Sequence, residues 1–73
     1  MAKEKRIYNR IKAVLAEQGK TNLWLAAELE VNRTTVSKWC TNEVQPTMES
    51  LFRIADALNV DARELLVPPN KKL

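Results

Sequence analysis

Residues 20–39, KTNLWLAAELEVNRTTVSKW, contain two short helical patterns separated by very few residues. Thr21 suits the N-cap of the first helix and Asn32 that of the second, because short polar side chains accept hydrogen bonds from the free N–H groups at a helix start. The small Ala26 lets the two helices approach closely. Their apolar contacts come from five residues, Leu25, Leu29, Val31, Val36 and Trp39. The chain must turn sharply between the two patterns, and this is the spacing of a helix-turn-helix unit.

Upstream of this unit, apolar residues recur at the spacing of one helical face. They are Ile7, Ile11, Val14 and Leu15. Gly19 follows as a natural C-terminal cap, because glycine adopts the left-handed conformation that often ends a helix. The pattern predicts a helix over residues 6–18.

Downstream of the unit, residues 43–46 are predicted to form a loop, because Pro46 lacks a backbone donor and favours extended geometry before it. Thr47 then caps a helix whose apolar stripe is Leu51, Ile54, Ala55 and Leu58. Asp61 and Glu64 are spaced as in a capping box, which predicts a short fifth helix to about residue 66. Pro68 and Pro69 stop that helix, and residues 70–73 are expected to fray.

The whole chain of 73 residues has room for one domain. No strand-like alternation or internal repeat appears, and the connections are short. We therefore expect an all-α fold, a compact five-helix domain over residues 1–67 with a tail over 68–73. The second and third helices would form its helix-turn-helix.

The composition excludes several classes of protein. Cys40 is the only cysteine and there is no histidine, so an intrachain disulfide and the usual zinc-ligand sets cannot form, and we expect no metal and no cofactor. The longest apolar run has five residues, 23–27, which is too short to cross a membrane. No catalytic pair or phosphate-binding glycine loop is present, so the sequence argues against an enzyme. A reducing, cytoplasmic setting fits.

The formal charge of +3 is unevenly distributed. Residues 1–38 carry eight Lys or Arg against four acidic residues, whereas residues 39–73 carry four against five. This asymmetry suits a polyanionic partner.

Three segments together resemble the lambda-repressor-like, Cro/repressor-type (XRE) family of helix-turn-helix regulators. They are residues 20–39 as quoted, NEVQPTMESLFRIADAL (42–58) and NVDARELL (59–66). The resemblance covers about residues 9–66. The chain departs from the family pattern at Glu30, where glycine is usual in a left-handed conformation, and a side chain there costs roughly 1 kcal/mol. Asn42 and Asn59 also stand where glycine is common, but asparagine tolerates that geometry.

The resemblance implies that the third helix lies in the major groove of double-stranded DNA. Carried over position by position, its base-contacting residues are Asn32, Arg33, Thr34, Ser37 and Lys38. Arg33 can donate two hydrogen bonds to guanine O6 and N7, and Lys38 can reach a neighbouring acceptor. The resemblance places phosphate contacts at Asn22 and Thr41. Thr34 and Thr35 can pack a methyl group against thymine or bond phosphate, and Thr35 is assigned to phosphate.

Several of these residues have a second interpretation. The charges of Arg33 and Lys38 could simply form the solvated face of a helix, although their position in the motif favours contact with DNA. Trp39 is predicted to be core rather than a base-stacking platform, and Trp24 to pack within the molecule rather than add to a contact surface. Cys40 is expected to be inert rather than a redox switch. The basic run Lys3, Lys5, Arg6 is either a solubilising tail or an arm along phosphates.

The favoured function is a transcriptional repressor that binds DNA as a homodimer on two half-sites about one helical turn apart. Dimerisation would use the apolar C-terminal segment Leu65, Leu66, Val67 and Pro68. The alternative is an antitoxin-type module that binds a partner toxin and regulates its own gene. A controller of restriction-modification genes is a variant of the first hypothesis.

Overall fold

The fold is seen in a computed structural model that describes residues 6–68. Its helices are α1 (Ile11–Glu17), α2 (Asn22–Leu29), α3 (Arg33–Cys40), α4 (Met48–Leu58) and a 3-10 helix, η1 (Ala62–Leu65). The all-α prediction is confirmed, but the fifth α-helix is not: a single 3-10 turn stands in its place. Lys3, Lys5, Pro69 and the tail 70–73 lie outside the described residues.

The predicted N-caps of α2, α3 and α4 are confirmed. The side chains of Thr21, Asn32 and Thr47 accept hydrogen bonds from the backbone N–H groups of Trp24, Thr34 and Ser50, respectively. Each bond satisfies a donor that would otherwise have no partner within the helix. Local sequence therefore fixes where these three helices begin.

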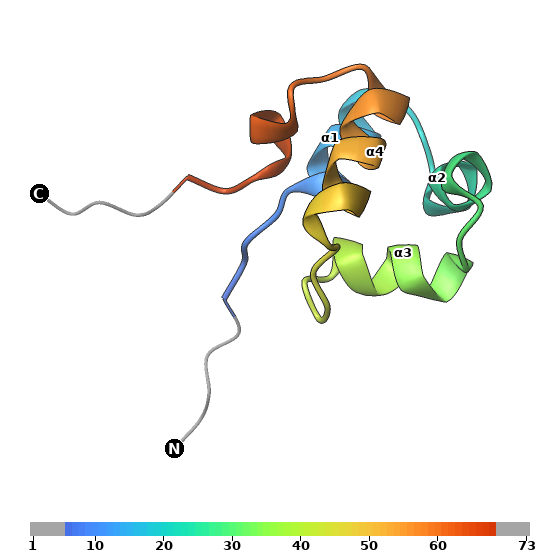
Figure 1. The fold of residues 1–73 in the computed structure, drawn as a ribbon, viewed down its shortest axis with the longest axis horizontal. Helices are drawn as coiled ribbons and strands as arrows, with labels where there is room; N and C mark the ends of the chain where they lie inside the picture. The colour runs from blue at the N-terminus through green and yellow to red at the C-terminus, as the bar shows by residue number, and fades with distance from the viewer. Residues whose placement is uncertain (1–5, 69–73) are drawn as a thin grey trace, which may run out of the picture.

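One core contains residues from all four α-helices and η1. It comprises Ile11, Val14, Leu15, Leu25, Ala26, Leu29, Val36, Trp39, Cys40, Leu51, Ile54, Ala55, Leu58 and Leu65. Every apolar position predicted for the second, third and fourth helices is buried, except Val31, which is half-buried against the core. In Figure 1, α3 lies along one edge of the molecule, below α4 and next to α2.

The start of the first helix differs from the prediction. α1 begins at Ile11 rather than at residue 6, and Ile7, predicted to face inward, is 50% exposed. The preceding residues are extended because they pair with the end of the domain: Val67 N–H donates to the Tyr8 carbonyl and Arg10 N–H to the Leu65 carbonyl, both at 2.9 Å. Ile7 has the spacing of a helical face, but pairing with residues 65–67 keeps the segment around it extended.

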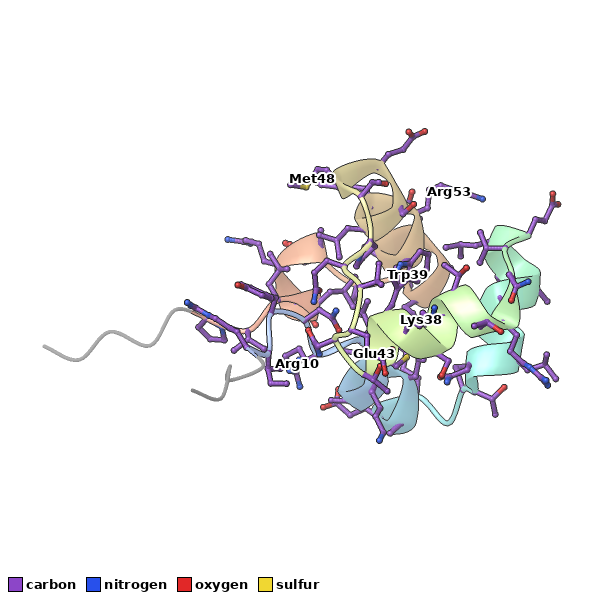
Figure 2. The ribbon with its side chains drawn as sticks, turned by 90° about the horizontal axis from the view of Figure 1, so that it is seen from below. Arg10, Lys38, Trp39, Glu43, Met48 and Arg53 are labelled. Atoms are coloured by element: carbon purple, nitrogen blue, oxygen red, sulfur yellow. The ribbon has the colours of Figure 1, made fainter. Side chains whose placement is uncertain are left out.

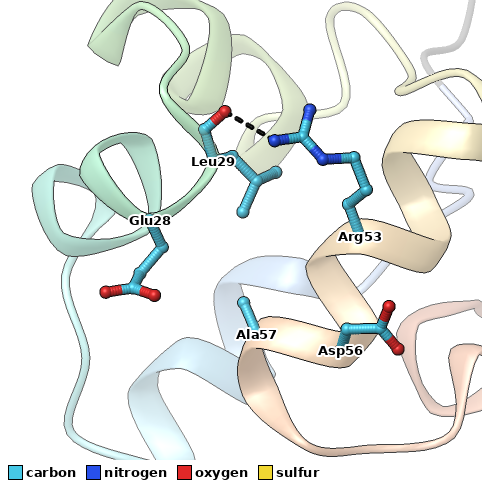
Figure 3. Close-up of a pocket in the computed structure, with 5 residues that line it drawn as sticks. All are labelled: Glu28, Leu29, Arg53, Asp56 and Ala57. Carbon is cyan, nitrogen blue, oxygen red and sulfur yellow. Dashed lines mark hydrogen bonds between the residues drawn. The ribbon is translucent and has the colours of Figure 1, made fainter.

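The residue that follows α2 is left-handed, as the sequence predicts. Glu30 has a φ of 58°, and Asn42 and Asn59 have φ values of 62° and 57°. The end of α2 is also held from α4, because the guanidinium of Arg53 donates to the Leu29 carbonyl at 2.8 Å (Figure 3). A cation at this position stabilises the negative end of a helix. The turn into α3 is therefore fixed by backbone geometry and by a side chain.

Glu30→Gly is expected to raise the free energy of unfolding by about 1 kcal/mol, because glycine adopts a positive φ without the clash of a Cβ atom. Urea unfolding followed by circular dichroism measures the change. Asn59→Gly is the matched control and should change stability less, since asparagine already tolerates this conformation. A Glu30→Gly protein no more stable than the wild type would contradict the assigned strain.

The capping box predicted for the fifth helix does not form as expected. Asp61 caps η1, but its carboxylate accepts from the backbone N–H of Arg63 at 2.9 Å and from the Arg63 guanidinium. Hydrogen bonds from the Arg63 side chain lower the pKa of Asp61 from its ordinary value of 3.8 to about 2, and the hydrogen bond from the Arg63 backbone N–H makes the next largest contribution.

This lowered pKa predicts a loss of stability in acid. The folded carboxyl releases its proton more readily than the unfolded one, so the stabilisation is complete above about pH 4 and is lost as the pH falls through about 2. In Asp61→Asn the free energy of unfolding should therefore fall less steeply over this range. A carbon NMR titration of the Asp61 carboxyl checks the midpoint directly. Equal slopes for the two proteins would contradict the assignment.

Candidate nucleic-acid interface

The two faces of α3 differ sharply. Val36 is fully buried and Trp39 is 5% exposed, which confirms that Trp39 belongs to the core. The opposite face carries four of the five predicted base-contacting residues, Arg33, Thr34, Ser37 and Lys38, and the fifth, Asn32, is the N-cap; all five are exposed. Figure 2 views the molecule from the side on which α3 lies, with Lys38 labelled on that helix. The helix is anchored by its apolar side and presents a polar surface.

The charges on this surface are available to an external partner. The ion pairs in the described residues join Arg10 to Glu17 and Arg63 to Asp61, away from α3. Within residues 6–68, the side chains of Arg33 and Lys38 have no ion-pair or hydrogen-bond partner. Two cations on the exposed face of α3 thus form no ion pair within the described residues.

Asn32 has a structural task as well as a place on the polar surface. Its Oδ1 accepts from the Thr34 N–H at 2.7 Å, so the oxygen caps α3. The amide nitrogen remains as the donor for a ligand. In a contact with a base, Asn32 would therefore donate a hydrogen bond from its amide nitrogen.

The predicted phosphate-contacting residues lie at the flanks of α3. Thr35 is half-buried on the helix itself, whereas Thr41 is exposed at its C-terminal end, where its Oγ1 donates to the Lys38 carbonyl at 3.2 Å. Asn22, the first residue of α2, is half-buried, and its Oδ1 accepts from the Cys40 Sγ at 3.3 Å. The structure thus brings Asn22 to the end of α3 next to Thr41.

Cys40 is a buried part of the core. Burial raises the pKa of its thiol, against a smaller opposite effect of the Lys12 charge. The protonated thiol is the form that donates to Asn22, and it is the less reactive form toward oxidants. These observations favour the structural interpretation of Cys40 over the redox switch.

Trp24 packs within the molecule, as predicted. Its ring is half-buried against the core, and the Lys20 ammonium lies 4.5 Å from the ring centroid. A cation over an aromatic face is an attractive contact. One face of the Trp24 ring is thereby covered by the chain's own lysine.

The prediction that Leu65 takes part in dimerisation is wrong. Leu65 is fully buried in the core, because η1 turns it inward, and it cannot contact a partner. Leu66 and Val67 remain 42% and 38% exposed. Leu66 lines an apolar groove together with Tyr8, Asn9, Gln45, Pro46, Met48 and Leu51.

One cluster at the C-terminal end of α3 escaped the sequence analysis. Asn9, Asn42 and Gln45, here called the amide junction, form a network of side-chain hydrogen bonds. Asn42 was singled out only for its backbone conformation, and Asn9 was not singled out. Asn9 lies more than 30 residues from both Asn42 and Gln45, so no local sequence signal marks this pairing.

Within residues 6–68, no group of three or more acidic, cysteine or histidine residues could hold a metal ion. None of the described helices combines the length and the apolar character needed to span a bilayer.

Comparison with known proteins agrees with this geometry. Residues 11–65 match the family model described as Helix-turn-helix. The transcriptional repressor RstR of cryptic phage CTXphi, from Vibrio cholerae, is 37% identical over 62 residues, which is 85% of this chain and 52% of the repressor. The chain thus spans about half the length of that relative.

Two solved structures share the fold. The crystal structure of a candidate DNA-binding protein from Bacteroides fragilis superposes with a TM-score of 0.79 at 47% identity, over 81% of this chain and 95% of the other. The SOS-response transcriptional repressor LexA from Eubacterium rectale gives a TM-score of 0.73 at 23% identity, over 88% and 68%, which shows the fold alone. The chain belongs to the Helix-turn-helix family of the XRE type, a family of DNA-binding transcriptional regulators.

Proposed function

We propose that α3 lies in the major groove of double-stranded DNA and that its exposed face discriminates between base sequences. The observation that carries the proposal is the pair of unneutralised cations, Arg33 and Lys38, on a helix whose other face is locked in the core. A groove about 12 Å wide admits such a helix. The base-contacting residues are Asn32, Arg33, Thr34, Ser37 and Lys38, and the phosphate-contacting residues are Asn22, Thr35 and Thr41.

The two cations are expected to contact different base pairs. Lys38 follows Arg33 by five positions, which is about 7.5 Å along a helix axis. Successive base pairs are about 3.4 Å apart along each strand. A helix lying along the groove would therefore place these side chains about two base pairs apart. Arg33 suits guanine, because its guanidinium donates to O6 and N7 together.

The proposed regulatory outcome is repression. A relative with 37% identity is a phage transcriptional repressor, although this chain spans only about half of it. A protein that occupies a promoter through α3 would block access to it without any catalytic step. Residues 1–67 are proposed as the DNA-binding domain, with η1 in the position of the fifth helix expected from lambda-repressor-like proteins.

The proposed assembly is a homodimer that uses the apolar groove. Met48 is 69% exposed beside Tyr8 and Leu66, and these side chains offer an apolar surface close to the end of α3. In a two-fold dimer, the patch on one protomer contacts the same patch on its partner. The two α3 helices of this dimer would enter grooves about 34 Å apart.

The test of this function is selection of bound sequences from a random double-stranded DNA library. The proposal predicts an enriched palindrome with half-sites about one helical turn apart. Enrichment of a single half-site would support base discrimination and contradict the dimer. No enrichment would contradict the proposed function and would favour the antitoxin-type alternative.

Met48→Glu tests the dimer surface separately. Met48 begins α4, and a carboxylate near a helix N-terminus is favourable, so the fold should persist. The new charge would be buried in the dimer, so affinity for the palindrome should fall about a hundredfold, the gain that joining two half-sites commonly provides. Band-shift titration measures the change.

The control for Met48→Glu is Ala16→Glu, which adds the same charge at an exposed position of α1. Its affinity for the palindrome should fall little. Equal losses in the two variants would show that repulsion of DNA, and not loss of the dimer, explains the effect.

A further inference from the structure

Asn9 is a buried polar residue that joins three separate parts of the chain. It is 3% exposed. Its Nδ2 donates to the Trp39 carbonyl at 3.0 Å and to the Gln45 Oε1 at 2.8 Å. Its Oδ1 accepts from the Ile11 N–H at 3.1 Å, which satisfies the first free donor of α1. One side chain thus links the start of α1, the end of α3 and the loop that follows.

Asn42 completes the amide junction from the other side. Its Oδ1 accepts from the N–H groups of Tyr8 and Asn9 at 2.9 and 3.0 Å, and its Nδ2 donates to the Asn9 carbonyl at 3.1 Å. Gln45 donates to the same Oδ1 at 3.1 Å. No buried side-chain nitrogen or oxygen in the described residues lacks a partner. A fully bonded network of this kind specifies one arrangement of the segments that it joins.

The junction acts on the part of α3 that carries Lys38. The Trp39 carbonyl bound by Asn9 belongs to the next residue along the chain, and the N–H groups of Glu43 and Val44 donate to the Lys38 carbonyl at 3.0 and 3.3 Å. The other end of α3 is held independently, by the Asn32 cap and by the turn at Glu30. Loosening the junction should therefore shift Lys38 more than Arg33.

We infer that Asn9 is a positioning residue that sets the place of Lys38 in the DNA complex. This inference rests on the proposed function. Asn9 lies in the extended segment before α1, away from the exposed face of α3, so its effect passes through the Trp39 carbonyl. We therefore predict that the amide of Asn9 governs discrimination at the base pairs that depend on Lys38 and not at those that depend on Arg33.

The test compares Asn9→Ser with the wild type on the selected DNA site and on all its single-base variants, at fixed salt. Serine keeps an oxygen that can accept from Ile11 N–H, but its side chain is too short to donate to both Trp39 and Gln45. Arg33→Ala and Lys38→Ala first identify which base pairs depend on each cation. All proteins are assayed at a temperature at which circular dichroism shows them folded.

The matched control is Gln18→Ala. Gln18 Nε2 donates to the Leu58 carbonyl at 2.9 Å, which is the same kind of bond from a side-chain amide to a helix end, but at α4. Its loss should lower stability without changing the pattern of base discrimination. Gln45 belongs to the amide junction but is itself exposed. Gln45→Ala therefore provides a second test if Asn9→Ser does not fold.

Asn9→Ser is expected to lose about tenfold discrimination at the Lys38-dependent base pairs, the size of one weakened base contact. Discrimination at the Arg33-dependent base pairs should stay within about twofold, as for independent sites. Gln45→Ala should show a smaller loss at the same positions. A uniform fall at all positions, or discrimination unchanged as expected for Gln18→Ala, would overturn the inference. Absence of any preferred sequence for the wild type would instead overturn the proposed function.

Discussion

Trp39→Ala is expected to lower the free energy of unfolding by about 3–5 kcal/mol. The indole is 5% exposed, at the point where α3 meets the rest of the core, and its removal leaves a cavity that short helices can fill only in part. A domain of this size has a total stability at the low end of about 5–15 kcal/mol. The variant should therefore be largely unfolded at 37 °C.

Thermal and urea unfolding followed by circular dichroism measure this loss. Trp24→Ala is the matched control, because it removes the same side chain from a half-buried position on α2. Its loss should be clearly smaller, and DNA binding should persist at low temperature. Equal losses for the two tryptophans would contradict the assignment of Trp39 as the main anchor of α3.

Arg33→Ala is expected to lose about 1–3 kcal/mol of discrimination at one guanine, with much less effect at other positions. The guanidinium is exposed and has no acidic partner in residues 6–68, so removing it breaks no ion pair within them. The fold should stay as stable as that of the wild type. Band-shift titration against single-base variants of the selected site measures the change.

A modified base makes this prediction sharper. Replacing the guanine by 7-deazaguanine removes the N7 acceptor and should weaken wild-type binding but leave Arg33→Ala unaffected. Lys38→Ala is the control and should respond to the modified base as the wild type does. If Arg33→Ala and the modified base each weaken binding independently, Arg33 does not contact that guanine.

The features of the fold that the sequence predicted are those set by neighbouring residues. Thr21, Asn32 and Thr47 lie directly before the helices that they cap, and the apolar spacing of α4 recurs within each turn. The left-handed residues Glu30 and Asn42 stand where a helix must end. Local hydrogen bonding and steric limits decide such features, so a single sequence suffices to predict them.

The features that the sequence missed depend on distant pairing. α1 starts late because residues 8–10 pair with residues 65–67, and Leu65 is buried because η1 packs it on the core. The amide junction joins Asn9 to residues more than 30 positions away. The five base-contacting candidates on α3 were predictable as an exposed face, but which of them contacts which base depends on a DNA complex and stays a prediction.

The central claim is that the exposed face of α3 is the surface that binds DNA. Nuclear magnetic resonance titration of the isotope-labelled protein with its selected duplex tests this claim most directly, because the amide shifts of the described residues other than Pro46 and Pro68 report on local contact. The account predicts the largest shifts at residues 32–38, with further shifts at Asn22 and Thr41. Shifts centred on the apolar groove around Tyr8, Met48 and Leu66, with residues 32–38 unchanged, would contradict it.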